Sequence, residues 1–195
     1  MGVINVTPDS FSDGGKFRDP EEAVKKAWEM AEEGADIVDI GGESTRPGSE
    51  PVSEDEELRR VIPVIEKLTV KDFPLSISID TYKARVAREA VFAGAAMVND
   101  ISGLKFDPEM VAVVADTGVT VVLMHTKGRP KEMQNDVRYG SLFGEITEYL
   151  KESISLAEAH QVSPEAIIID PGIGFGKSPE DNLRIIRGLA AFKVL

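Results

Sequence analysis

The sequence opens with MGVINVTPDSFSDGG at residues 1–15, where an apolar run changes abruptly into polar, turn-forming residues. The run at Val3 and Ile4 is short and apolar, which indicates a buried strand. The residues from Asn5 to Gly15 then predict a long polar loop, and loops after strands are where α/β proteins often carry their functional residues. The same order of strand, polar loop and helix recurs down the chain.

Capping residues mark the helices that follow. Four helix starts carry an N-cap residue followed by proline or an acidic residue, at residues 19–21, 53–56, 107–109 and 178–181. Glycines at positions 34, 94 and 118 follow periodic apolar segments, as glycines after helix ends do. The apolar spacing at residues 139–160 predicts one further, longer helix.

Short apolar runs alternate with these helices, at residues 3–4, 36–40, 75–79, 96–99, 119–124 and 166–169, and a seventh run begins at residues 192–195. Repeated strand–helix units with short connections predict an α/β fold with a parallel sheet. Because these strands are apolar throughout, we expect them to be buried on both faces. A (β/α)8 barrel and an open, doubly wound sheet both satisfy this pattern, and the residue types do not separate them.

The composition limits the classes of function. The 195 residues suffice for one domain, and the net charge of −12 argues against nucleic acid as a partner. No apolar run is long enough to cross a membrane. The absence of cysteine excludes disulfides and thiolate metal sites and fits an intracellular protein. If the substrate is an anion, its site must be locally positive within an acidic molecule.

Three polar residues, Asp80, Asn99 and Asp170, stand at the ends of otherwise apolar strands. The carboxyl ends of parallel strands meet at one edge of the sheet, where ligands bind. Asp80 could instead cap the next helix, and Asn99 could be an ordinary turn residue. Taken together, two carboxylates and one amide favour a polar heterocycle that offers several N–H donors.

Two other motifs are weaker. The glycine-rich segment at residues 172–178 is similar to a phosphate loop, but Pro171 stands where that loop needs its first glycine. His125 would be the sole histidine at the strand ends, and a lone histidine without cysteine makes zinc improbable. A hard cation held by Asn5 and by substrate phosphates suits this sequence better.

Five motifs together identify a family resemblance. Residues 1–15 resemble the dihydropteroate synthase signature, and so do DIGGESTRPG at 39–48, SIDTY at 78–82, VNDISG at 98–103 and DPGIGFGK at 170–177. They stand in the family's order. The resemblance implies a TIM (β/α)8 barrel, a cytoplasmic homodimer and a role in folate biosynthesis. The family condenses 7,8-dihydropterin-6-ylmethyl diphosphate with 4-aminobenzoate, without nucleic acid or membrane partners, and uses Mg²⁺.

The resemblance also assigns roles to residues of this chain. The pterin is expected to contact residues at the strand ends: Asp80, Asn99, Ile101, Met124, Asp170 and Phe175. The aminobenzoate is expected to lie against two loops, through Phe11, Thr45, Arg46 and Pro47. Asn5 would help to place Mg²⁺ and the diphosphate. Asp13, Arg46 and Asp170 would act in catalysis, where carboxylates favour the cationic methylene left by diphosphate loss.

The length departs from the family pattern. Six or seven strand–helix units fit into 195 residues, whereas a barrel has eight. We therefore expect a single pterin-binding domain at residues 1–195 that is incomplete at its C-terminal side. Two alternatives stay open: a pterin-binding methyltransferase that serves a corrinoid protein, and a noncatalytic fragment. The loops at residues 7–15 and 43–48 suit the synthase, because they suit a second, aminobenzoate-like substrate.

Overall fold

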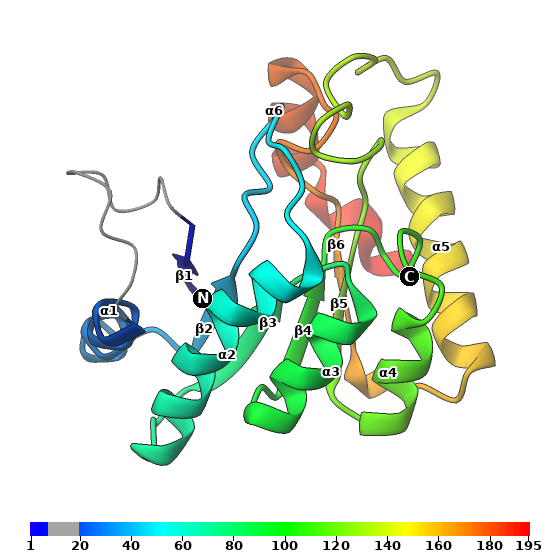
Figure 1. Cartoon of the computed structure of the whole chain (residues 1–195). Helices are drawn as coiled ribbons and strands as arrows, with labels where there is room; N and C mark the ends of the chain where they lie inside the picture. Colours follow the sequence, from blue (N-terminus) through cyan, green and yellow to red (C-terminus); the bar gives the residue numbers. More distant parts are fainter. Residues whose placement is uncertain (8–19) are drawn as a thin grey trace.

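Six strands alternate with helices in the computed structural model, which describes residues 1–7 and 20–195 (Figure 1). The strands are β1 (Gly2–Asn5), β2 (Ile37–Gly41), β3 (Ser76–Asp80), β4 (Met97–Asp100), β5 (Thr120–Met124) and β6 (Ile167–Asp170). The helices are α1 (Pro20–Glu32), α2 (Glu54–Val70), α3 (Ala84–Ala93), α4 (Met110–Thr117), α5 (Leu142–Ala159) and α6 (Pro179–Arg187). Two 3₁₀ turns, η1 (Pro164–Ala166) and η2 (Leu189–Val194), complete these elements.

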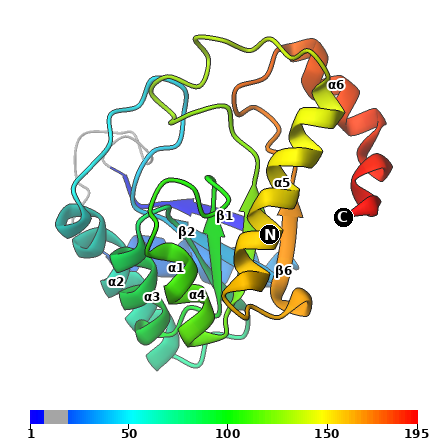
Figure 2. The ribbon, with the colours of Figure 1, turned by 90° about the vertical axis from the view of Figure 1, so that its right-hand side faces the viewer.

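The strand order resolves the choice between the two architectures. The strands form one parallel sheet in the order β1-β2-β3-β4-β5-β6, so each strand pairs with the next one in the chain. Right-handed crossovers between consecutive neighbours place the helices on one side of the sheet, and Figures 1 and 2 show α1 to α5 around the outside of its curve. A doubly wound sheet would reverse its order at a switch point. The fold is therefore the partial barrel of the (β/α)8 type that was expected.

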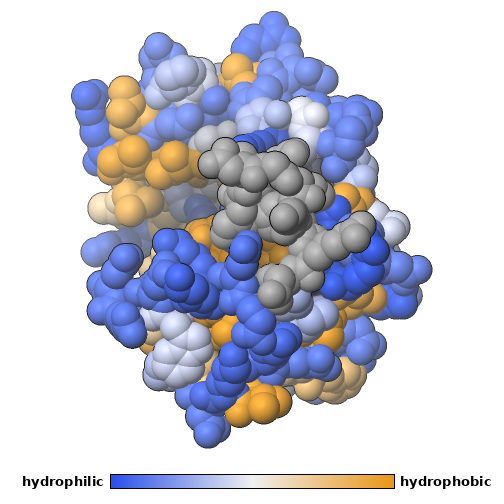
Figure 3. Space-filling view, turned by 60° about the vertical axis from the view of Figure 1, so that its left-hand side comes forward, coloured by the Kyte–Doolittle hydropathy of each residue, from blue (hydrophilic) through white to orange (hydrophobic). Residues whose placement is uncertain are grey.

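The main core lies between the sheet and its helices. Side chains alternate along a strand, and those of Val38, Ile40, Ile77 and Ile79 point outward into this core, with exposed fractions of 5% or less. The expectation of burial on both faces is confirmed for the central strands, where Met97 and Val122 of the inner face are each 7% exposed, and is wrong for the inner face of the outer strand β1. There Val3 is 52% exposed, and Figure 3, which brings the β1 side forward, shows hydrophobic residues around a recess.

The expected seventh strand at residues 192–195 is also wrong, since Phe192 lies in the 3₁₀ turn η2. Its side chain is buried against Leu142, Ile146 and Ile185, with the ring of Phe143 at 5.6 Å between centroids. The backbone is satisfied locally, because Ala191 N donates to the Gly188 carbonyl. Packing against α5 and local hydrogen bonds therefore favour a helical turn over an unpaired strand.

Of the four helix starts predicted from capping residues, the cap at Asp19 lies outside the described residues, and one of the other three differs from the prediction. Ser53 and Ser178 are N-caps whose hydroxyls accept from Glu56 N and Asp181 N. Asp107 does not cap its own helix: α4 starts at Met110, and the Asp107 carboxylate accepts from Ala84 N at the start of α3. In the part of the chain described here, no helix is long and apolar enough to cross a membrane.

Candidate active site

The polar strand ends line up across the sheet. Asn5 pairs in register with Gly41, Gly41 with Asp80, and Asp80 with Asn99. A Cβ atom on Gly41 would lie 3.4 Å from both the Asn5 Oδ1 and the Asp80 Oδ2 atoms, so these two oxygens border one space. The structure therefore brings Asn5, Asp80 and Asn99 together at the carboxyl edge of β1, β3 and β4.

Asp39 joins this row, and the sequence analysis missed it. The Asn99 amide donates to Asp39 Oδ2 over 2.9 Å. The sequence does contain a signal for Asp39, because this aspartate stands between the apolar residues Val38 and Ile40 of a strand. Alternation along β2 turns Asp39 away from the core and onto the inner face of the sheet, with an exposed fraction of 3%.

Several polar atoms on this inner face are buried without a hydrogen-bond partner in the part of the chain that the structure describes. Asp39 Oδ1, Asp80 Oδ1 and the Ser78 hydroxyl are buried without a hydrogen bond among the described residues. Burial raises the pKa of the Asp39 carboxyl. Burial, and then the charge of Asp39, raise the pKa of Asp80 well above its ordinary value. Buried acceptors of this kind are costly unless a ligand supplies donors.

Asp170 ends β6, where the motif DPGIGFGK forms its turn. Met124 pairs in register with Asp170, and Asp170 Oδ1 accepts from Gly172 N at 2.7 Å. Gly172 has a φ of +70°, and a Cβ atom there would lie 1.9 Å from the His125 carbonyl oxygen. Only glycine fits at this turn. The close contact between the loops after β5 and β6 therefore fixes the position of Asp170.

Lys177 is buried behind this turn and is a second residue that the sequence analysis did not single out. Its ammonium lies 2.9 Å from His125 Nδ1 and 2.9 Å from the Phe175 carbonyl oxygen. Burial lowers the pKa of Lys177 to about 7 and that of His125 to about 3. A pair of this kind links the two loops that flank Asp170.

The apolar residues assigned to the pterin lie together. Ile101 and Met124 are buried in one cluster with Tyr82, and Phe106 and Phe175 pack against it. Tyr82 and Phe106 meet edge to face, with 5.5 Å between ring centroids. These residues follow β3, β4, β5 and β6, so the apolar cluster lies at the same end of the sheet as the polar row.

A pocket of about 500 Å³ lies beside the polar row. It is lined by Asn5 and Thr7 after β1 and by much of the loop after β2, including Thr45, Arg46 and Pro47. Arg46, which lines this pocket, is exposed. Its guanidinium gives the pocket the local positive charge that an anionic substrate needs. Phe11 and Asp13, the other predicted residues of this side, lie outside the described residues.

The residues that could hold a metal are few. Within the described part of the chain, no three acidic or histidine side chains are grouped as metal ligands. Asn5 offers a single amide oxygen that lines the pocket. Mg²⁺ is commonly held by few protein ligands together with substrate phosphates and water, so this donor fits such a site.

Comparison with known proteins agrees with this geometry. The model of the family "Pterin binding enzyme" matches residues 1–195. The dihydropteroate synthases of Synechocystis sp. and Bacillus subtilis are 50% and 52% identical to the chain over 195 residues. The chain covers 67% and 66% of those two proteins, so it spans about two thirds of their length.

Solved structures show the same relationship. The Xanthomonas albilineans dihydropteroate synthase with 4-aminobenzoic acid superposes with a TM-score of 0.91 and 47% identity, over 100% of this chain and 68% of that one. The same enzyme in complex with 7,8-dihydropteroate gives a TM-score of 0.86 and 44% identity, with the same coverage. The chain therefore belongs to the pterin-binding enzyme family and, within it, to the dihydropteroate synthases.

Proposed function

We propose that this chain carries the substrate-binding face of a dihydropteroate synthase, which condenses 7,8-dihydropterin-6-ylmethyl diphosphate with 4-aminobenzoate to give 7,8-dihydropteroate and diphosphate. One observation carries the proposal. Asp80 Oδ1 is a buried acceptor without a hydrogen bond within residues 1–7 and 20–195, and it lies on the concave face beside Asn99, whose amide holds Asp39. A pterin edge presents several N–H donors to such acceptors, and charge-assisted hydrogen bonds of this kind are strong.

The pterin ring would then lie between the polar row and the apolar cluster. The Asp80 carboxylate would accept hydrogen bonds from the edge of the pterin, and the Asn99 amide would donate a hydrogen bond to it. Asp170 would bind the pterin from the end of β6. Ile101, Met124 and Phe175 would pack on its faces, because they are gathered at the same end of the sheet. The relatives described above are synthases, which favours this reaction over the methyltransferase alternative.

The second substrate would enter the pocket beside Asn5. Thr45, Arg46 and Pro47 line it, and we assign them, with Phe11, to the aminobenzoate side. The Arg46 guanidinium would attract a carboxylate or the diphosphate, since both are anions. The Xanthomonas albilineans relative is known in complex with 4-aminobenzoic acid, which supports this assignment.

In the reaction the bond between the pterin methylene and the diphosphate oxygen breaks, and a bond to the aminobenzoate nitrogen forms while that nitrogen loses a proton. Positive charge develops on the methylene. The Asp170 carboxylate, with that of Asp13, would stabilise this charge electrostatically. We further propose that Asn5 holds Mg²⁺, which when bound supplies positive charge for the departing diphosphate.

We also propose, from the family resemblance alone, that the protein is a cytoplasmic homodimer. Sedimentation equilibrium tests the assembly: a single species with twice the chain mass is expected. A monomer at every concentration would contradict the dimer.

Turnover tests the proposed reaction directly. The purified chain would be mixed with both substrates and Mg²⁺, and 7,8-dihydropteroate would be measured by mass spectrometry. Product is expected only when both substrates are present. Asp80→Asn should lower kcat/KM by about tenfold or more, since a hydrogen bond to a charged group contributes about 1.5–3 kcal/mol. A folded chain without product, or an unaffected variant, would contradict the proposal.

A further inference from the structure

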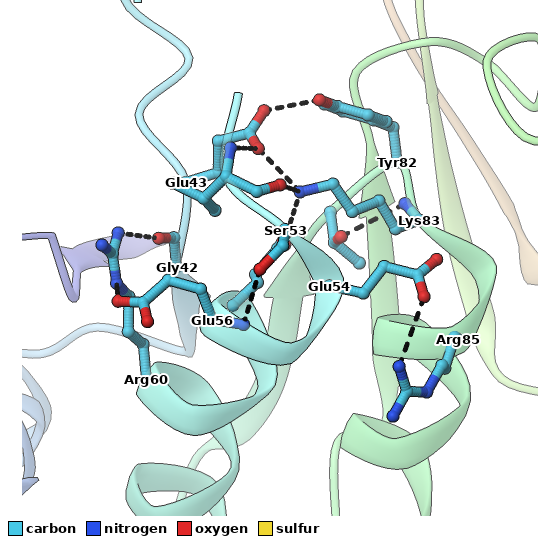
Figure 4. Close-up of polar contacts among 12 residues, drawn as sticks. Gly42, Glu43, Ser53, Glu54, Glu56, Arg60, Tyr82, Lys83 and Arg85 are labelled. Carbon is cyan, nitrogen blue, oxygen red and sulfur yellow. Dashed lines mark hydrogen bonds and ion pairs between the residues drawn. The ribbon is translucent and has the colours of Figure 1, made fainter. Parts of the chain in front are cut away.

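The loop between β2 and α2 is closed at its base by one ammonium group (Figure 4). Lys83 Nζ lies 2.7 Å from Glu43 Oε2 and 2.8 Å from the Val52 carbonyl oxygen. Glu43 Oε2 also accepts from Val52 N over 2.8 Å. Glu43 and Val52 stand on either side of residues 44–51, so Lys83 joins the two ends of this segment, which includes Thr45, Arg46 and Pro47.

Further contacts fix the first end of the loop. The Tyr82 hydroxyl donates to Glu43 Oε1 at 2.6 Å, and an Arg60 guanidinium nitrogen donates to the Gly42 carbonyl at 2.8 Å. A Cβ atom on Gly42 would lie 2.8 Å from a Val61 methyl carbon, so the chain passes directly over α2 at this point. The loop base is therefore held from α2 on one side and from the start of α3 on the other.

The stability of α3 does not explain why a lysine stands at position 83. Lys83 is the N-cap residue of α3, where its side chain makes no capping hydrogen bond. A positive charge at a helix N-terminus opposes the helix dipole. The capping bond to Ala84 N comes instead from Asp107. Lys83 thus occupies an unfavourable position on its own helix, and its contacts are with the β2–α2 loop and with Glu57 of α2.

The groups around Lys83 are buried. Glu43 is 5% and Glu57 is 1% exposed, and the Lys83 side chain is 12% exposed. Such buried ion pairs add little net stability, because removing charges from water costs as much as their attraction returns. Their value lies in fixing geometry, which is what a loop that contacts a substrate requires.

We propose that Lys83, acting with Glu43, is a positioning residue that fixes the segment 44–51 for the second substrate and ties it to β3 three residues after Asp80. This inference rests on the proposed function, since it assigns the 4-aminobenzoate side of the site to that segment. The contacts of Lys83 are with protein groups, namely Glu43, Glu57 and the Val52 carbonyl, so its proposed effect on the substrate is indirect. Lys83 sets where Thr45 and Arg46 stand relative to the pterin bound at Asp80.

The test compares Lys83→Met with Arg85→Met. Arg85 also links α3 to α2, through Glu54 and Asp55, but it does not contact the loop, so it controls for the loss of a cation between these helices. Lys83→Met should raise KM for 4-aminobenzoate by about tenfold, the effect of one charged hydrogen bond, and leave KM for the pterin diphosphate within about twofold. Arg85→Met should change neither value.

Amide hydrogen exchange gives a second measurement that needs no turnover. Exchange at residues 44–51 should be faster in Lys83→Met and unchanged in Arg85→Met. Equal exchange in Lys83→Met and the parent chain would overturn the positioning role, whatever the activity. If the parent chain shows no turnover but exchange at residues 44–51 is faster in Lys83→Met, the proposed function is refuted and the positioning role is not.

Tyr82→Phe keeps the inference testable if Lys83→Met does not fold. It removes only the hydroxyl that donates to Glu43 and preserves the ring. A smaller rise in KM for 4-aminobenzoate, of about threefold, and faster exchange at residues 44–51 are expected. A parallel rise of both KM values in this variant would overturn the inference.

Discussion

At the scale of single residues, Asp80 is placed where its charge lowers stability. Burial and the nearby Asp39 raise the pKa of its carboxyl well above the ordinary value. A carboxyl whose pKa is raised on folding stabilises the fold below its unfolded pKa, and this contribution is lost as pH rises through the folded pKa. The unfavourable free energy of the buried Asp80 charge is therefore largest at neutral and alkaline pH.

Asp80→Asn should consequently stabilise the free protein near pH 7.5, by an amount on the order of 1 kcal/mol, and should change stability less at pH 4. The same substitution should weaken pterin binding, because it removes a carboxylate acceptor. Urea unfolding at both pH values checks the first effect. A variant that is less stable than the parent at pH 7.5 would contradict the assigned electrostatics.

Lys177 gives a pH dependence of its own. Burial lowers the pKa of its ammonium to about 7, whereas an unfolded lysine titrates at about 10.4. A depressed pKa contributes stability that is complete above the unfolded value and is lost as pH falls to the folded value. The chain should therefore gain stability between pH 7 and pH 10.

Lys177→Met should flatten this rise, by up to about 1.4 kcal/mol per pH unit within the window. Urea unfolding of both proteins from pH 7 to 9.5 measures the two slopes. Lys127→Met is the matched control, since the Lys127 side chain is 26% exposed whereas Lys177 is 3% exposed. Equal slopes in the parent and Lys177→Met would contradict the buried ammonium.

At the scale of secondary structure elements, neighbouring units cap one another. The Asp107 carboxylate, which follows β4, accepts from Ala84 N at the start of α3 and from Glu109 N in its own turn. Lys83 supplies no cap there. Asp107 therefore connects the third and fourth strand–helix units through two backbone donors.

Asp107→Ala should destabilise the chain by about 1–2 kcal/mol, the usual effect of losing an N-cap side chain. Asp116→Ala serves as the control, because its side chain is 66% exposed and its nearest cation, Arg88, is 3.7 Å away. That change should stay within about 0.5 kcal/mol. Thermal or urea unfolding decides the point, and equal losses in the two variants would refute the capping role.

The elements that could be predicted from sequence are those set by local signals. Ser53 and Ser178 mark helix starts through bonds to residues three positions ahead, and Gly118 ends α4 in the left-handed conformation. Contacts between distant residues gave no such signal. Asp107 caps a helix that starts more than twenty residues before it. Phe192 lies in a 3₁₀ turn that packs against α5, although its apolar run predicts a strand.

The same distinction holds for the candidate site. Asp80, Asn99 and Asp170 were predictable because strand ends of a parallel sheet must meet at one edge. Asp39 was missed, since its place beside Asn99 depends on which face of β2 it occupies. The Lys83–Glu43 contact joins residues forty positions apart, and only the folded chain shows it.

At the scale of the whole molecule, the six-stranded sheet has two outer strands. Within the described residues, β1 pairs only with β2 and β6 only with β5. Val3 on β1 and Ile168 on β6 are 52% and 44% exposed. Open edges of apolar strands favour pairing with other chains. The 195-residue chain by itself should therefore associate as its concentration rises.

Val3→Lys should reduce this association, because a charge on an edge strand opposes pairing. Val70→Lys is the control, since Val70 is 83% exposed at the end of α2, away from the sheet edge. Light scattering over a concentration series measures both. A similar response of the two variants, or a monodisperse monomer of the parent chain, would speak against association through β1.

The central claim is that the concave, polar face of this sheet binds a pterin. Calorimetry with 7,8-dihydropterin-6-ylmethyl diphosphate and Mg²⁺ tests it on the parent chain, on Asp170→Asn and on the exposed control Asp116→Asn. We expect micromolar binding, about −8 kcal/mol, that is lost in Asp170→Asn and kept in the control. No binding by the folded parent chain, or equal binding by all three proteins, would contradict it.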